Sequence, residues 1–399
     1  FVDPAAEKSI YFSRLKEYFM KLSCSQEELS RALGVVGRAV PRRTTLPSTQ
    51  NVLMVSEGSS VRLSTTNLEI AITTWMECAV EEDGACSVPA ALLTELVNSI
   101  PPGEVHLSVN QEPANMHIES GRFEASVNCG DVNDFPPLPT VEETVAARIS
   151  ADDFRTAISQ VAFAAASDES RPVLTGIKTE ITGQNFVLAA ADGFRLAVHT
   201  GKLQTPFTET IDVVIPARTL EEVARVAGDS RNSQAEIELS VTPAKSQILL
   251  RLPNVVIVGQ LTQGQFPDYK QLIPDSKDSS CNATINLESI SRAARTAAIL
   301  ARDSNGIVRL VFMPADDNGT LQISSSADEV GENQEEIDAQ VIGEASKIAF
   351  SSRYLIDVLR NMPGTEVVIE TSSPSSPGVF RPVADDSYVH VVMPMFVRW

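Results

Sequence analysis

Cysteine and histidine, the side chains that most often carry nucleophilic or metal chemistry, are few and scattered in this chain. The 399 residues contain five cysteines and four histidines. No two cysteines form a C-x-x-C pair, and the histidines show no metal-ligand spacing. An odd number of scattered cysteines is typical of reduced, buried thiols, so we expect a cytosolic protein without a disulfide or a metal site. These residues are Cys24, Cys78, Cys86, Cys129, Cys281, His106, His117, His199 and His390.

Paired carboxylates and phosphate-binding loops give no catalytic signal either. Asp–Asp pairs begin at Asp152, Asp316 and Asp385, but each falls at an expected helix start or in a turn, where capping and solvation explain it. The chain has no G-x-x-x-x-G-K-[ST] loop, no G-x-G-x-x-G, no H-E-x-x-H and no G-x-S-x-G elbow. The sequence therefore predicts neither a catalytic site nor a cofactor, and an enzyme with an unrecognised site stays an alternative.

The arginines are distributed unevenly. The formal net charge of −20 alone argues against a nucleic-acid partner. However, residues 25–43 carry four arginines against two glutamates, residues 286–302 three against one glutamate, and residues 351–362 two against one aspartate. If these expected helices line one surface, that surface could face phosphates while the acidic strands and loops lie elsewhere. The alternative is that the arginines are ordinary solvated helix residues.

The elements that must position these arginines are repeated three times. An apolar residue followed by three small residues occurs at Leu63, Leu188 and Ile323, at spacings of 125 and 135 residues. A second motif repeats at similar spacings, 127 and 135 residues, and begins at Val88, Ile215 and Phe350. Two landmarks with nearly the same spacing indicate three copies of one domain, an arrangement that usually builds a ring or an array.

In each repeat copy, the sequence pattern predicts a helix, several strands, a second helix and further strands, in that order, over about 120 residues. Ser25, Ser150 and Asn286 are the expected N-caps of the first helices, with a capping box after Ser25. Short β-branched runs separated by turn signals indicate antiparallel strands. The pattern predicts an α+β fold in which each domain packs two helices on antiparallel sheets. The expected helices cover residues 25–43, 88–99, 150–166, 216–228, 286–302 and 351–362.

The expected domains span residues 20–140, 148–274 and 280–399, with polar, proline-rich joins between them. Residues 1–19 lie outside the repeat and precede a plausible initiator, Met20, so we interpret them as an extension or a cloning remnant. No stretch approaches the roughly 18 uninterrupted apolar residues of a membrane helix, and no secretory signal is evident.

Four segments resemble the bacterial DNA sliding clamp family, the β subunit of DNA polymerase III. The resemblance covers residues 20–399, and three of its segments match the family motifs T-D-G-x-R-L-A, G-x-F-P-D-Y and V-M-P-[MV]. The fourth looks like the loop after the first helix. The segments are residues 43–47 (RTTLP), 191–197 (ADGFRLA), 264–269 (GQFPDY) and 391–395 (VVMPM).

The resemblance implies a head-to-tail homodimer that closes into a pseudo-sixfold ring, with helices around the hole and sheets outside. It also implies a processivity factor that encircles duplex DNA without sequence specificity, as a non-catalytic subunit of a DNA-directed DNA polymerase holoenzyme. Weak phosphate contacts are then enough, because topology prevents escape and tight contacts would impede sliding. The implied partners are double-stranded DNA, the replicative polymerase catalytic subunit, the clamp loader and other clamp-motif replication and repair proteins, with no membrane.

The family has one hydrophobic peptide-binding cleft per chain, between the second and third domains. The matching positions in this chain are Leu174, Ala191, Gly193, Phe194, Arg195, Leu196, Pro267, Leu272, Val392, Met393, Pro394 and Met395. Methionine and proline suit an adaptable apolar surface, although Met393 and Met395 could also be ordinary strand packing. The chain departs from the family pattern at Ala191, at Gln271 and in the tail Phe396–Trp399, so partner preference could differ.

The same resemblance suggests the residues that meet DNA. Arg43 matches the loop that meets the duplex, and the charged helices add further candidates. The predicted DNA-binding residues are Arg43, Arg38, Arg42, Arg292, Arg295, Arg302 and Arg360. Two other interpretations stay open: a repeat-built interaction scaffold that uses its cleft without DNA, and an enzyme whose site the sequence does not reveal.

Overall fold

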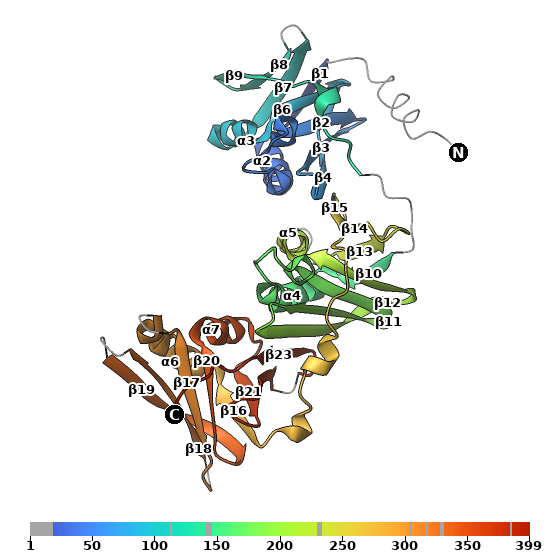
Figure 1. Ribbon diagram of the computed structural model, residues 1–399. Helices are drawn as coiled ribbons and strands as arrows, with labels where there is room; N and C mark the ends of the chain where they lie inside the picture. Colours follow the sequence, from blue (N-terminus) through green and yellow to red (C-terminus); the bar gives the residue numbers. More distant parts are fainter. Residues whose placement is uncertain are drawn as a thin grey trace. The chain divides into compact units, whose positions relative to one another are not determined.

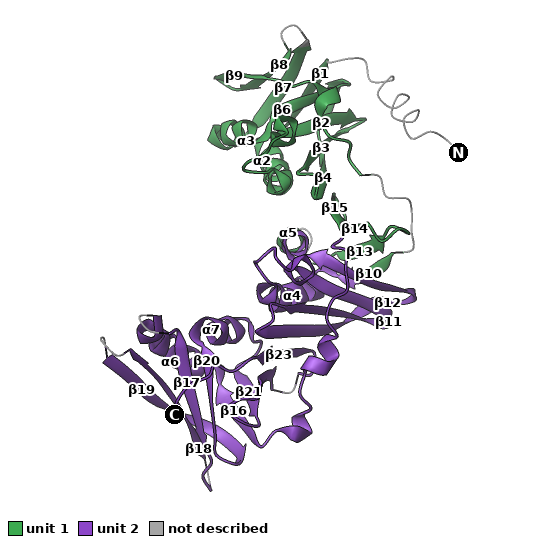
Figure 2. Ribbon diagram, viewed as in Figure 1, with its two compact units in different colours: residues 1–148, 225–260 green, residues 149–224, 261–399 purple. Residues whose placement is uncertain are grey.

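The computed structural model describes residues 19–111, 114–139, 146–229, 234–302, 305–316, 318–327, 331–383 and 385–399 (Figure 1). The chain forms two compact units, residues 1–148 with 225–260 and residues 149–224 with 261–399 (Figure 2). Within the described ranges, no helix has the length and apolar character needed to cross a membrane. Apart from Phe19, the extension expected over residues 1–19 falls outside the described part of the chain.

The first unit contains two sheets. A five-stranded sheet has the order β5-β1-β7-β8-β9, and an eight-stranded sheet the order β10-β13-β14-β15-β4-β3-β2-β6. The helices are α2 (Gln26–Val36) and α3 (Ala90–Ser99). The strands are β1 (Met20–Ser25), β2 (Asn51–Glu57), β3 (Ser60–Thr66), β4 (Ile70–Glu77), β5 (Ala79–Glu82), β6 (Ala85–Pro89), β7 (Glu104–Gln111), β8 (Ala114–Ser120), β9 (Phe123–Asn128), β10 (Ala147–Ser150), β13 (Glu236–Val241), β14 (Gln247–Leu252) and β15 (Val255–Gln260).

The second unit is built on a ten-stranded sheet with the order β11-β12-β23-β22-β21-β16-β19-β18-β17-β20. Helix α6 packs against α7 and against β17 to β19 (Figure 1). The helices are α4 (Ala151–Val161), α5 (Ala217–Ala227), α6 (Leu287–Arg302) and α7 (Ser352–Asn361). The strands are β11 (Gly176–Ala191), β12 (Arg195–Pro216), β16 (Cys281–Asn286), β17 (Ile307–Met313), β18 (Gly319–Ala327), β19 (Gly331–Gly343), β20 (Ser346–Ser351), β21 (Glu366–Thr371), β22 (Gly378–Pro382) and β23 (Tyr388–Val392).

The repeat copies are joined by strand pairing at two equivalent junctions. Strand β4 pairs antiparallel with β15, and Ile72 lies opposite Ile257. Strand β12 pairs in the same way with β23, and Ala197 lies opposite His390. Ile72 and Ala197 are 125 residues apart, the spacing of the sequence repeat. Each junction therefore joins an inner strand of one copy to the last strand of the next copy.

The helix ends differ from the sequence expectation. The helix expected over residues 25–43 ends as an α-helix at Val36 and continues only as a 3₁₀ turn, Gly37–Ala39. Gly37 and Pro41 explain this early end, since glycine weakens a helix and proline interrupts its hydrogen bonds. Arg42 and Arg43 consequently lie in a loop. In addition, the three copies open with the short strands β1, β10 and β16 rather than with the expected helices.

Two of the three expected N-caps are confirmed. The Ser150 hydroxyl accepts a hydrogen bond from the Asp153 backbone N–H, and Asn286 Oδ1 accepts one from the Ser289 N–H. The capping box at Ser25 is wrong, because the Ser25 side chain makes no capping hydrogen bond. The start of this helix is instead held by Gln26, whose backbone N–H donates to Gly103 O and whose side chain donates to Val97 O.

Candidate functional sites: an apolar cleft and an arginine-bearing helix pair

A tight turn between β11 and β12 organises the candidate cleft in the second unit. Asp192 Oδ1 accepts hydrogen bonds from the backbone N–H groups of Phe194 and Arg195. Gly193 between them has φ +94°, a conformation that residues with a side chain rarely adopt. A Cβ at this position would also come within 2.8 Å of the Arg171 guanidinium, which donates to the Asp192 carbonyl. The glycine of the A-D-G-F-R-L-A segment is therefore required by the turn.

Arg195 lies under the cleft, with only 4% of its side chain exposed. Its Nε donates to Asp192 Oδ2, its Nη1 to Asp357 Oδ2 at 2.6 Å and its Nη2 to the Phe163 carbonyl at 2.6 Å. Asp357 belongs to α7, so this one side chain ties the β11–β12 turn to a helix of the next repeat copy. The structure thus gives Arg195 a positioning role beneath the apolar surface.

Tyr354 packs against both Arg195 and Phe194, and it is not among the site residues predicted from the sequence. Its ring lies 4.6 Å from the Arg195 guanidinium carbon and stacks on Phe194 with 6.4 Å between ring centroids. Burial raises the pKa of the Tyr354 hydroxyl, and the nearby Asp192 carboxylate adds to the effect. The residue does fall in the second repeated motif, but that pattern marks a helix start and says nothing of contacts across domains.

The floor of the cleft is a cluster of buried side chains on one face of the sheet. Leu174, Ala191 and Leu196 pack there with Phe266, Tyr269 and Val391 among others. Val392, which the sequence analysis had selected, is fully buried but does not belong to this cluster. Successive residues of a strand face opposite sides of a sheet, so the one-residue difference explains why Val391 takes that place.

The rim of the cleft exposes large apolar side chains. Phe194 is 57% exposed, Leu272 50% and Met393 44%. Phe194 and Met393 are held side by side, because the Met393 N–H donates to the Phe194 carbonyl. Gly193 and Pro267 are exposed as well, and Pro394 and Met395 are half-buried. A cavity of about 490 Å³ lined by Arg171, Phe194, Tyr354 and others opens beside this rim.

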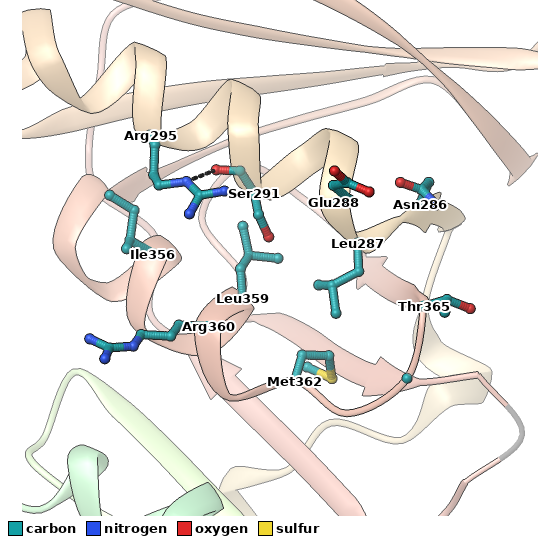
Figure 3. A pocket seen from close by; sticks show the side chains of 11 residues that line it. Asn286, Leu287, Glu288, Ser291, Arg295, Ile356, Leu359, Arg360, Met362 and Thr365 are labelled. Carbon is teal, nitrogen blue, oxygen red and sulfur yellow. Dashed lines mark hydrogen bonds between the residues drawn. The ribbon is translucent and has the colours of Figure 1, made fainter.

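The arginines expected on the helices are all exposed. Arg295 on α6 and Arg360 on α7 line one cavity of about 640 Å³, where both lie on the same side in Figure 3. The Arg295 Nε donates to the Ser291 carbonyl. Arg292 instead forms a 2.6 Å ion pair with Glu335 of β19. Arg302 ends α6 in the same unit, and Arg38, Arg42 and Arg43 belong to the first unit.

The cysteines are free thiols, and three of the five are buried. Burial raises the pKa of the Cys24 thiol to about 12 and that of Cys129 to about 11. Thiols that stay protonated at neutral pH are weak nucleophiles. Among the described residues, no group of three or more histidine, cysteine, aspartate or glutamate side chains is placed to hold a metal ion.

Three domain profiles of one family match almost the whole chain. The DNA polymerase III β subunit N-terminal domain matches residues 20–139, the central domain residues 148–268 and the C-terminal domain residues 270–396. The β sliding clamp of Synechococcus elongatus is 32% identical over 384 residues, which cover 95% of this chain and 100% of that protein. The chain belongs to the β sliding clamp family. The Bacillus subtilis clamp is 29% identical, over 94% of this chain and 99% of its own.

Solved clamp structures share the fold. The crystal structure of the Bacillus subtilis clamp has a TM-score of 0.88 at 28% identity and covers 95% of this chain and 100% of its own. The Pseudomonas aeruginosa clamp bound to griselimycin has a TM-score of 0.86 at 26% identity, with the same coverage. The threefold repeat is therefore the three-domain clamp fold, in which each domain combines helices with antiparallel sheets.

Proposed function

We propose that this clamp closes as a head-to-tail homodimer around duplex DNA and acts as the processivity factor of a DNA polymerase. It would be a non-catalytic subunit of the holoenzyme, with domains at residues 20–140, 148–274 and 280–399. Its five free cysteines suit the reducing cytoplasm. One observation supports the ring. The threefold repeat has three equivalent strand junctions: two are formed within the chain, by β4 with β15 and by β12 with β23, and the third has no partner strand among the described residues.

Among the described residues, the open junction has a strand edge without a partner strand on each side. Strand β9 is at the edge of its sheet. The first half of β19 pairs with β18 on one side, and β16 pairs only with residues 339–343 on the other. By the repeat, residues 331–335 correspond to the parts of β4 and β12 that pair with β15 and β23. A second copy that supplies β9 would close this junction, and two copies would close a ring.

Exposed apolar side chains support the same contact. Phe163, after α4, stacks on His390 of the last strand at the closed junction, with ring centroids 5.4 Å apart. The equivalent residue at the end of α6 is Ile299, which is 61% exposed. Leu92 on α3, the repeat equivalent of Tyr354, is 45% exposed. Both positions would be covered by the second copy.

The cleft is the proposed docking site for the replicative polymerase, the clamp loader and other clamp-motif proteins. Phe194 and Met393 provide adjacent apolar anchors, and a few such anchors dominate peptide grooves. At the other closed junction the equivalent residues are Glu69 and Gln260, joined by the same backbone hydrogen bond. Their side chains are polar, so this junction lacks the pair of apolar anchors that Phe194 and Met393 provide at the other. Griselimycin, bound in a Pseudomonas clamp structure, is a ready probe for binding.

The proposed DNA contacts are Arg43, Arg38, Arg42, Arg292, Arg295, Arg302 and Arg360, all exposed. Their number suits weak, sequence-independent phosphate contacts, since the ring itself would prevent escape. Arg43→Ala should reduce loading and salt-dependent DNA association with little change in folding. Arg251→Ala, at an exposed arginine on β14, is the charge-matched control. Unchanged DNA association in Arg43→Ala would contradict this assignment.

Retention on circular DNA tests the proposed function directly. The clamp is loaded on nicked circular DNA, and its retention is compared before and after the DNA is linearised. A topological clamp should be lost only upon linearisation. Equal retention on both forms would indicate ordinary surface binding, and no association with either, despite a competent loader, would favour the scaffold interpretation.

A further inference from the structure

The chain continues past the cleft along a defined path. The Met395 N–H donates to the Ala349 carbonyl of β20 at 2.7 Å. Four residues later, the Lys347 ammonium lies 5.0 Å from the centroid of the Trp399 ring, a cation–π contact. Since β20 is an edge strand of the ten-stranded sheet, these two contacts hold residues 395–399 at both ends beside that edge.

Phe396 lies between these two anchors with 94% of its surface exposed. Its neighbours Met395 and Val397 are half-buried, whereas Phe396 and Arg398 are exposed. This alternation is that of an extended strand, in which every second side chain faces away from the protein. The segment therefore presents the phenylalanine ring to solvent, three residues after Met393 of the cleft rim.

We propose that Phe396 is an additional anchor that selects partner peptides longer than the cleft. The proposal rests on the proposed peptide-binding function of the cleft. A peptide seated on Phe194 and Met393 would continue along residues 395–399 and place a large apolar side chain on Phe396. Arg398 is exposed like Phe396 and follows it by two residues, so it lies on the same side of the segment, and a carboxylate next to that apolar residue would be favoured. The occupant is thus the acidic and aromatic continuation of a cleft-bound peptide.

Labelled synthetic peptides test the proposal on the full-length protein. The core probe carries only the anchors Leu-Ala-Leu-Phe, and two longer probes extend it by Trp-Asp at one end or the other. A matched pair carries Ala-Ala in place of Trp-Asp. On the unaltered chain, one Trp-Asp probe should bind about tenfold more tightly than its Ala-Ala partner, as measured by fluorescence anisotropy.

Variants locate the source of this gain. Phe396→Ala should abolish it without changing the affinity of the core probe. Trp399→Ala should reduce it, because the segment loses one of its two anchors. Ile342→Ala removes another exposed apolar side chain, 63% exposed on β19, and should leave the gain intact.

Two outcomes would overturn the proposal in distinguishable ways. If neither Trp-Asp probe gains affinity, or if the gain survives Phe396→Ala, Phe396 is not an anchor although the cleft stands. If the core probe and griselimycin both fail to bind the unaltered chain, the cleft itself is refuted and the extension with it.

Discussion

At the scale of single residues, Arg195 is the side chain on which the candidate cleft depends. It is buried, it makes three hydrogen bonds to two repeat copies, and its guanidinium packs on Tyr354. Lysine keeps the charge but cannot reproduce the planar fork or the stacking. We expect Arg195→Lys to lower the free energy of unfolding by about 1–3 kcal/mol, the cost of buried polar groups left unpaired. It should also weaken binding of cleft peptides, as measured by urea unfolding and anisotropy.

The neighbouring Arg171 provides the control. It is exposed and donates a hydrogen bond to the Asp192 carbonyl. Arg171→Lys should therefore change the free energy of unfolding by less than about 1 kcal/mol. A similar decrease in the free energy of unfolding in both variants would show that the burial of Arg195 does not add to stability.

His390 predicts how stability depends on pH. It is fully buried against Phe163, and burial lowers its pKa to about 3. The unfolded chain binds a proton near pH 6.5 while the folded chain does not, so stability from the neutral ring is present above pH 6.5. It is lost as the pH falls toward 3, by up to about 1.4 kcal/mol per pH unit. Urea unfolding at several pH values should show a shallower acid slope for His390→Phe. His106→Phe, at an exposed histidine, should keep the original slope.

At the scale of elements, the sequence was informative where local periodicity decides the structure. All six expected helices form within the ranges that the apolar spacing predicts, although the first ends at Val36 rather than at residue 43. Other features depend on tertiary contacts. Strand β1 exists because β5 and β7 pair with it, and the support of the cleft by Tyr354 depends on α7 meeting the β11–β12 turn. A family motif could select Phe194 and Met393 but could not show that Val391, rather than Val392, faces the cleft floor.

The three helix N-termini give a prediction at this scale. Ser150 caps α4 through its hydroxyl, whereas the Ser25 side chain makes no capping hydrogen bond. Ser150→Ala should therefore lower the free energy of unfolding by about 1 kcal/mol, and Ser25→Ala by clearly less. Chemical denaturation of the two variants in parallel measures the difference. Equal losses would mean that the sequence signature, rather than the observed hydrogen bond, describes the cap.

At the scale of the whole molecule, the triplicated sequence predicts three similar domains but not how a ring would close. How a ring would close depends on which strand edges have no partner in the fold. The pairing of β4 with β15 and of β12 with β23 shows which kind of strand edges meet at a junction. The first half of β19 and the edge of β9 then become the surfaces that two copies would share. The strand register at this shared surface follows from the repeat. Residue 333 is equivalent to Ile72 and Ala197, because each has the same place in the hairpins β18–β19, β3–β4 and β11–β12.

That register gives a prediction about the dimer that can be tested by cross-linking. Asn333 should lie opposite Ala125 of a second copy, as Ala197 lies opposite His390 within the chain. Under mild oxidation, a chain carrying both Ala125→Cys and Asn333→Cys should form covalent dimers on a denaturing gel. The pair Ser126→Cys and Asn333→Cys should not, because a shift of one residue turns the side chains to opposite faces of the sheet. Ile299→Asp, which places a charge at the apolar contact, should shift the native mass from the dimer toward the 43.1 kDa monomer. Efficient cross-linking of the shifted pair alone would refute this register, and an unaltered chain that stays monomeric at micromolar concentrations would refute the ring.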